Sequence, residues 1–182
     1  PENKQKLKDF SSLLIQQIDT MSDVAEAFSD FASLPKPKMK KADLVEVTKM
    51  AVSIFDKKHI IFSSNKSQIF HKLDKTQWIR IITNIVQNAL QSVPKERNPI
   101  IGVQLSTETD KTILSITDNG DGIPDDIGDK IFEPKFTTKT SGMGLGLGIV
   151  KKIIESHKGS IEYISKNRKG TTFTITLPNF GD

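Results

Sequence analysis

The sequence predicts an α+β fold in which helices cover one face of a mixed, mainly hairpin-linked sheet. Three observations lead to this prediction. Apolar residues recur at helical spacing in several separate segments, shorter segments alternate in polarity, and glycines and prolines separate the two kinds of segment. With 182 residues, the chain is long enough for one domain with a sizeable core and one appended element.

The composition excludes several classes of function. Hydrophobic residues make up 36% and charged residues 26% of the chain, as in ordinary globular proteins. The net charge of +4 is too small and too evenly spread to indicate nucleic acid or a membrane surface. The absence of cysteine excludes disulfides and fits a reducing compartment. The chain begins at Pro1 without an initiator methionine, and no apolar run approaches the roughly 20 residues that span a bilayer. We therefore expect a cytoplasmic fragment of a longer protein, which is itself a candidate for membrane anchoring.

Residues 1–34 carry a heptad pattern that predicts a helix. One such helix cannot bury its own apolar stripe, so we expect a second helix, in a coiled coil or bundle, to cover it. Packing of the helix on its own domain is the alternative. The heptad positions, interrupted only by Gln17, are Leu7, Leu14, Met21 and Phe28 in one series and Phe10, Val24 and Phe31 in the other.

Two prolines, Pro35 and Pro37, end this helix, because proline lacks the amide donor and disfavours helix in the residue before it. We expect a lysine-rich linker over residues 35–42 and a second domain over residues 43–182. Its first elements are a helix over residues 44–55 and short strands over 60–62 and 68–73.

The longest predicted helix begins at a capping box, Asp74 to Gln77, and ends by Pro94. Alternation then predicts a hairpin of strands 100–107 and 112–117. A helix over residues 145–157 follows, with Gly159 as its left-handed cap. Two final strands are expected at 161–165 and 171–177.

Asn84 and Asn88 lie four residues apart on the polar face of the long helix. A carboxamide oxygen is a hard, neutral ligand suited to Mg²⁺ whose charge is balanced by phosphates. Asparagines on a helix are also common surface residues, so this reading depends on the motifs downstream.

Asp118 ends an apolar strand and precedes Gly120 and Gly122, which allow a ligand to approach the backbone closely. Its carboxylate can accept a hydrogen bond from an exocyclic amine such as that of adenine; the alternative is a turn aspartate. The segment from Ile123 to Ser141 contains aromatic residues between glycines and suits a mobile lid.

Gly144, Gly146 and Gly148 lead into a helix N-terminus, where free N–H groups and the helix dipole favour phosphate. The run is not a Walker loop, because no Gly-Lys-Ser or Gly-Lys-Thr is present. Lys139 precedes it and can meet phosphate charge. The three histidines show no metal or triad spacing; His59 and His71 are expected in strands and His157 at a helix end.

Four motifs in order resemble the N, G1, F and G2 boxes of sensor histidine kinases, and the C-terminal segment resembles the last strand of the same domain. These are residues 84–89 (NIVQNA), 118–122 (DNGDG), 132–139 (FEPKFTTK), 142–148 (GMGLGLG) and 170–173 (GTTF). The resemblance covers about 140 residues. Residues 1–34 look like the second helix of the dimerisation hairpin in nitrogen-regulation-type kinases.

The resemblance implies the Bergerat fold, a two-layer α/β sandwich that binds ATP and Mg²⁺ under a lid. It implies that Asn88 holds the metal and Asp118 binds the adenine amine. Asn84 stands where related ATPases place a glutamate base, which favours phosphoryl transfer over hydrolysis. The other residues carried over are Gly120, Gly122 and Thr171 at the base and Gly142, Gly144, Gly146 and Lys139 at the phosphates.

Two departures from the family pattern are present. Gln91 occupies the usual lysine position after the metal asparagine, with Lys95 as a candidate substitute. No histidine precedes His59, so the phosphoacceptor is expected outside these residues.

We therefore expect a kinase domain that transfers the γ-phosphoryl group of ATP to a histidine on another helix, for relay to a response-regulator aspartate. The full protein is expected to form a homodimer. The alternatives are an ATPase switch of the gyrase or Hsp90 kind and a nucleotide-binding dimerisation module without catalysis.

Overall fold

The structure, a computed structural model, describes residues 10–18, 21–22, 29, 34–133 and 144–179. Its helices and strands alternate along the chain in an α+β order. In sequence they are β1 (Lys40–Asp43), α2 (Leu44–Val52), η1 (Lys57–His59), β2 (Ile60–Ser64), β3 (Phe70–Leu73), α3 (Lys75–Ser92), β4 (Ile101–Thr107), β5 (Lys111–Asp118), η2 (Gly128–Phe132), α4 (Gly146–Ser156), β6 (Ser160–Lys166) and β7 (Gly170–Pro178).

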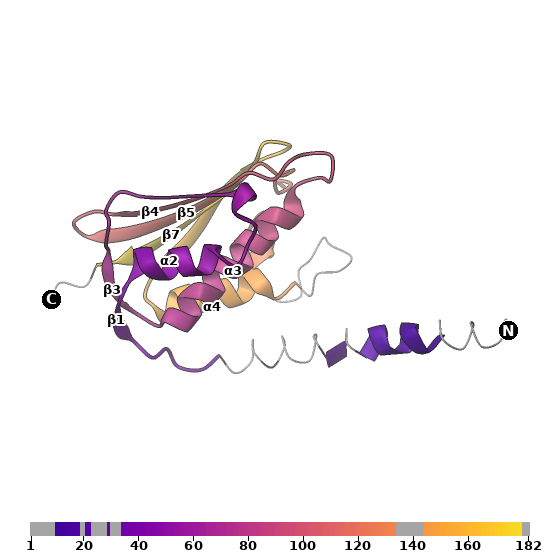
Figure 1. Cartoon of the computed structure of the whole chain (residues 1–182), viewed down its shortest axis with the longest axis horizontal. Coiled ribbons are helices and arrows are strands. Elements are labelled where there is room, and N and C mark those ends of the chain that lie inside the picture. The colour runs from indigo at the N-terminus through magenta and orange to yellow at the C-terminus, as the bar shows by residue number, and fades with distance from the viewer. Residues whose placement is uncertain (1–9, 19–20, 23–28, 30–33, 134–143, 180–182) are drawn as a thin grey trace.

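The main sheet has five strands in the order β2-β4-β5-β7-β6. β2 runs parallel to β4, and the other neighbours are antiparallel. β1 and β3 form a separate two-stranded antiparallel sheet. Figure 1 shows α2, α3 and α4 together on one side of the main sheet. This arrangement confirms the predicted α+β sandwich.

The core lies between the main sheet and the three helices, and strand alternation decides which residues enter it. In β5 the buried positions are Thr112, Leu114, Ile116 and Asp118. The intervening residues face away from the helices. Asp118 is therefore buried because it continues the core-facing series of an apolar strand by one more step.

The predicted start of α3 at Asp74 is confirmed. One Asp74 carboxylate oxygen accepts from the backbone N–H groups of Thr76 (2.9 Å) and Gln77 (3.2 Å). The reciprocal half of the predicted capping box is absent, because the Gln77 side chain donates to the Pro35 carbonyl instead. The second carboxylate oxygen accepts from Lys38 N–H (2.7 Å), so Asp74 joins the linker to α3.

These bonds affect the ionisation of Asp74. Partial burial on its own raises the pKa of this carboxyl, but the N–H groups of Lys38, Gln77 and Thr76 outweigh burial and hold the pKa below its usual value. His157 lies against the same corner: its Nε2 accepts from the Asp74 N–H, and its Nδ1 lies 2.8 Å from the Ile153 carbonyl. The structural role expected for His157 at the end of α4 is thus confirmed.

Three local predictions need correction. β1 begins inside the segment expected as a linker, because four residues with two lysines give no strand pattern and form one only by pairing with β3. The left-handed residue after α4 is Lys158 (φ 60°), not Gly159. Gly159 is needed for space, since a Cβ there would lie 2.6 Å from the Leu177 side chain. His59 lies in η1 rather than in a strand.

Part of the N-terminal segment is described, and Figure 1 shows it standing apart from the α/β body. Residues 10–18 are helical, and the heptad residues Phe10 and Leu14 are exposed. The heptad positions Leu7, Val24, Phe28 and Phe31 lie outside the described residues, so the continuous heptad helix stays a prediction. In the described ranges, no helix has the length and hydropathy that crossing a bilayer requires.

Candidate nucleotide-binding site

α3 carries the two predicted asparagines on the face that the apolar stripe leaves free. The Asn84 side chain is half-buried, and its Nδ2 donates to the Arg80 carbonyl one turn earlier (2.8 Å). Its Oδ1 faces the start of α4, where a Cβ on Gly146 would lie only 2.8 Å from it. Glycine at position 146 therefore lets the N-terminus of α4 approach α3 closely.

Asn88 lies one turn further along α3 and is half-buried. Across residues 34–133 and 144–179, its carboxamide has no hydrogen-bond partner, so its oxygen is available to a ligand. The described residues also contain no cluster of three His, Cys, Asp or Glu side chains that could hold a metal ion. A Mg²⁺ ion at Asn88 would therefore need further oxygen ligands from phosphate and water, as is usual for Mg²⁺.

Asp118 is 6% exposed at the end of β5, and three groups from three parts of the chain approach one of its oxygens. Oδ1 accepts from Gly120 N–H (2.8 Å), Thr171 N–H (3.2 Å) and the Ser92 hydroxyl (3.2 Å). These donors stabilise the negative charge and fix the orientation of the carboxylate. Asp118 is thus more than a turn residue, since it ties β5 to β7 and to the end of α3.

The turn after Asp118 has no room for side chains at its glycines. A Cβ on Gly120 would lie 2.0 Å from the Ser92 hydroxyl oxygen. Gly122 has a φ of 78°, and a Cβ there would lie 2.5 Å from the Lys166 carbonyl oxygen. Both glycines are therefore required by the packing of the turn. Their predicted role in admitting the base of a ligand stays a prediction.

Thr171 is buried at the start of β7, beside Asp118. Its hydroxyl lies 3.0 Å from the Ser165 hydroxyl, which also accepts from the Ile123 N–H (2.7 Å). Through Thr171 N–H and this hydroxyl network, β7 supports both Asp118 and the segment that leaves the glycine turn. A contact of Thr171 with adenine stays a prediction.

The N-terminus of α4 lies at the other end of the candidate site. Gly144 has a φ of 63° and precedes Leu145, the N-cap residue, which provides no side-chain hydrogen bond. The first N–H groups of α4 are thus not capped by that residue, and with the helix dipole they favour an anion. Gly142 and Lys139, predicted to contact phosphate, lie outside the described residues.

Three residues of the site are not predicted from the sequence: Ser92, Arg97 and Gly170. Ser92 is four residues after Asn88, so the helical spacing of the asparagine pair could have identified it. Arg97 stands in a polar stretch without a motif. Gly170 belongs to the GTTF segment, and its φ of 95° brings a hypothetical Cβ to 1.9 Å from the Asp118 carbonyl oxygen.

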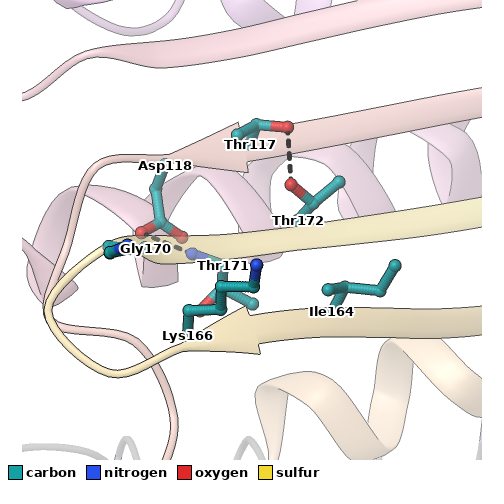
Figure 2. A pocket seen from close by; sticks show the side chains of 8 residues that line it. Thr117, Asp118, Ile164, Lys166, Gly170, Thr171 and Thr172 are labelled. Atoms are coloured by element: carbon teal, nitrogen blue, oxygen red, sulfur yellow. Dashed lines mark hydrogen bonds between the residues drawn. The ribbon is translucent and has the colours of Figure 1, made fainter.

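A hollow of about 150 Å³ lies at the ends of β5, β6 and β7, and Figure 2 shows side chains that line it. Its lining includes Thr117, Thr172 and Ile164, which alternate with core-facing residues and lie on the sheet face away from the helices. The Thr117 and Thr172 hydroxyls are 2.9 Å apart. Asp118, Gly170 and Thr171 also line this hollow, so it reaches the predicted base end of the site from the sheet face away from the helices. The predicted nucleotide site itself is on the side of α3 and α4.

Comparison with known proteins agrees with this geometry. Residues 73–180 match the family described as histidine kinase-, DNA gyrase B-, and HSP90-like ATPase. A putative NtrY-like sensor histidine kinase of Rickettsia conorii is 31% identical over 181 residues, 96% of this chain. The sensor histidine kinase ZraS of Escherichia coli is 38% identical over 117 residues, 64% of this chain. The chain spans 30% of the former and 25% of the latter.

Solved structures agree on the fold. The catalytic domain of the histidine kinase ThkA is 29% identical, with a TM-score of 0.70, and the match covers 78% of this chain and 96% of that domain. ThkA in complex with the response regulator protein TrrA matches with a TM-score of 0.77 at 23% identity, over 96% of this chain and 52% of that one. The chain therefore belongs to the histidine kinase-, DNA gyrase B-, and HSP90-like ATPase family, and its domain is an ATP-binding catalytic domain of the sensor histidine kinase type.

Proposed function

We propose that this domain transfers the γ-phosphoryl group of Mg²⁺-ATP to a histidine on a separate helix, for relay to an aspartate of a response regulator. The observation that carries the proposal is that α3 touches both ends of the site. Through Ser92 it contacts the adenine-binding candidate Asp118, and through Asn84 it contacts the first residue of the phosphate-facing helix α4.

Asn84 supports transfer rather than hydrolysis. A relative that hydrolyses ATP needs a general base to activate a water molecule near the γ-phosphate. A neutral carboxamide cannot accept a proton at neutral pH. Asn84 Nδ2 is already engaged with the Arg80 carbonyl, which orients the side chain instead of activating water.

None of the chain's own histidines suits the role of phosphoacceptor. His71 and His157 are buried, and both ring nitrogens of each lie within hydrogen-bond distance of protein groups. His59 Nδ1 lies 3.1 Å from the Pro99 carbonyl in a half-buried turn. An external histidine is therefore part of the proposal.

The residues of the site fit ATP with Mg²⁺. Asp118 would accept from the adenine amine, Asn88 would hold the metal, and Gly144 and Gly146 would admit phosphate to the start of α4. Mg²⁺ would neutralise charge that develops on the transferred group. Lys139, Gly142 and Thr171 complete the proposed contacts.

Two partners belong to this proposal. A response regulator is proposed because the relative ThkA has been solved in complex with the response regulator TrrA. A homodimer is proposed because the heptad pattern requires a partner helix and because Phe10 and Leu14 are exposed in the described residues.

The test combines calorimetric titration with labelling. We expect the 182-residue chain to bind ATP in a Mg²⁺-dependent manner and to remain unlabelled when incubated alone with [γ-³²P]ATP. Addition of the histidine-bearing helix from the same kinase should restore labelling. Steady ATP hydrolysis by the chain would indicate the ATPase switch instead, and absence of nucleotide binding would indicate a dimerisation module.

A further inference from the structure

Arg97 follows α3 by five residues and reaches back over the glycine turn after Asp118. Its Nη1 donates to the backbone carbonyls of Asn119 (2.5 Å) and Gly120 (3.2 Å). Its Nη2 is 3.6 Å from the Asp121 carboxylate. A guanidinium presents its donors in a fixed plane, so one side chain can hold two successive carbonyls. Arg97 therefore fixes the backbone path directly after Asp118.

Ser92, the last residue of α3, holds the same turn from the helix side. Its hydroxyl lies 2.7 Å from the Ala89 carbonyl and 3.2 Å from Asp118 Oδ1, so its single proton is shared between two acceptors. Its carbonyl accepts from Asp121 N–H (3.1 Å). With no space for a side chain at Gly120, the turn packs directly on the end of α3.

These contacts orient Asp118 before any ligand binds. A fixed carboxylate accepts from the exocyclic amine of adenine, whereas guanine presents a carbonyl oxygen at the equivalent position. Two acceptors cannot pair, and a site built around a hydrogen bond discriminates strongly against a ligand that lacks the matching donor. Discrimination of this kind depends on the carboxylate staying in place.

We propose that Arg97 and Ser92 are positioning residues that set a preference for adenine over guanine nucleotides by immobilising Asp118. The inference rests on the proposed nucleotide function. Neither residue needs to touch the nucleotide. Loss of either one leaves Asp118 held less firmly, by the N–H groups of Gly120 and Thr171. ATP then binds less tightly, while GTP binding, which gains nothing from the carboxylate, changes little.

The test is calorimetric titration of the 182-residue chain with Mg²⁺-ATP and with Mg²⁺-GTP. Arg97→Ala is expected to weaken ATP binding about tenfold, as for loss of hydrogen bonds from a charged donor, and to change GTP binding by less than about twofold. Ser92→Ala is expected to weaken ATP binding about threefold, because the Ser92 hydroxyl shares its single proton between two acceptors. Arg97→Lys should retain only part of the preference for ATP over GTP, measured as the ratio of the two affinities. An ammonium group lacks the planar set of donors that a guanidinium has.

Arg168→Ala is the matched control. It removes the same side chain from an exposed position near the turn, where Arg168 makes no side-chain hydrogen bond or ion pair within the described part of the chain. The ratio of ATP affinity to GTP affinity in this variant should equal that of the unaltered chain. Thermal unfolding of each variant separates loss of fold from loss of selectivity, and Ser92→Ala decides the question if Arg97→Ala does not fold.

The outcomes distinguish this inference from the proposed function. No ATP binding by the unaltered chain would contradict the proposed function itself. Equal binding of ATP and GTP by the unaltered chain would overturn the inference alone. Equal weakening of both nucleotides in Arg97→Ala and Ser92→Ala would also overturn it, because a merely structural role predicts that result.

Discussion

The two ends of the nucleotide site differ in how completely the protein builds them. At the base end, Asp118 is buried and accepts from Gly120, Thr171 and Ser92, and the turn after it is held by Arg97. At the phosphate end, the Asn88 carboxamide has no hydrogen-bond partner among residues 34–133 and 144–179. Under the proposed assignment, the base end is preorganised, whereas the phosphate end would need nucleotide and metal to complete it. Substitutions at the two ends should therefore have different effects.

The largest effect is expected from breaking the base end at Gly170. Gly170→Ala places a Cβ where only 1.9 Å separates it from the Asp118 carbonyl oxygen, at a φ of 95°. The backbone of Asp118 or of position 170 must move to relieve this clash. We therefore expect the free energy of unfolding to fall by roughly 3 kcal/mol or more. Urea denaturation measures it.

Gly128→Ala is the control for Gly170→Ala. Gly128 also has a positive φ (52°), but no atom of the described residues lies within 4 Å of its hypothetical Cβ. Gly128→Ala should lower the free energy of unfolding only by the penalty for a left-handed backbone, about 1 kcal/mol. Equal losses in the two variants would show that close packing against Asp118 adds nothing.

The next effect is on recognition without loss of fold. In Asp118→Asn, the remaining oxygen can still accept from Gly120 and Thr171 N–H, but the new amide opposes the adenine amine. We expect ATP affinity to fall about 10- to 100-fold, as for loss of a hydrogen bond to a charged group. Calorimetry measures the affinity, and an unchanged midpoint of thermal unfolding shows that the fold persists. Unaltered ATP affinity would contradict the assignment of Asp118.

Asn88→Ala tests the phosphate end. Loss of one neutral metal ligand should weaken Mg²⁺-ATP about tenfold and leave the affinities for metal-free ATP and adenosine unchanged. Parallel titrations with and without Mg²⁺ measure this. An equal loss for adenosine would show that Asn88 supports the base end instead, and the contrast between the two ends would then fail.

The smallest effect concerns Asp74, which fixes the start of the helix that joins both ends. Asp74→Ala should cost about 1 kcal/mol of unfolding free energy at pH 7, as for loss of a helix N-cap. The pKa of Asp74 is held below its ordinary value of 3.8, so the ionised carboxylate stabilises the fold above that pH. The contribution should fade as the pH drops below 3.8 through the lower pKa of the folded state.

Urea denaturation at pH 7 and about pH 3 measures this change. The difference in unfolding free energy between Asp74→Ala and the unaltered chain should be smaller at the lower pH. Asp125→Ala is the control, because the exposed Asp125 makes no hydrogen bond in the described residues. A gap that stays constant over this range would contradict the role of the ionised cap.

The sequence by itself determined the features that depend on neighbours along the chain. The Asp74 cap and the apolar stripe of Trp78, Ile81, Ile82, Ile85 and Val86 specify α3. Alternation specifies the hairpin of β4 and β5, and an aspartate one step beyond an apolar strand specifies a buried carboxylate. These signals are periodic or lie within a few residues, so they can be read without knowledge of the fold.

Only the tertiary structure decided which distant groups meet at Asp118. Ser92 is 26 residues before it and Thr171 is 53 residues after it, and Arg97 lies in a stretch with no periodicity. The same holds for β1, whose four residues become a strand only against β3. Such contacts depend on the packing of whole elements, and local propensity carries no information about them. The glycine motifs therefore indicated a nucleotide site, and the packing of α3 and β7 on the Asp118 turn showed how the carboxylate proposed to bind adenine is held in place.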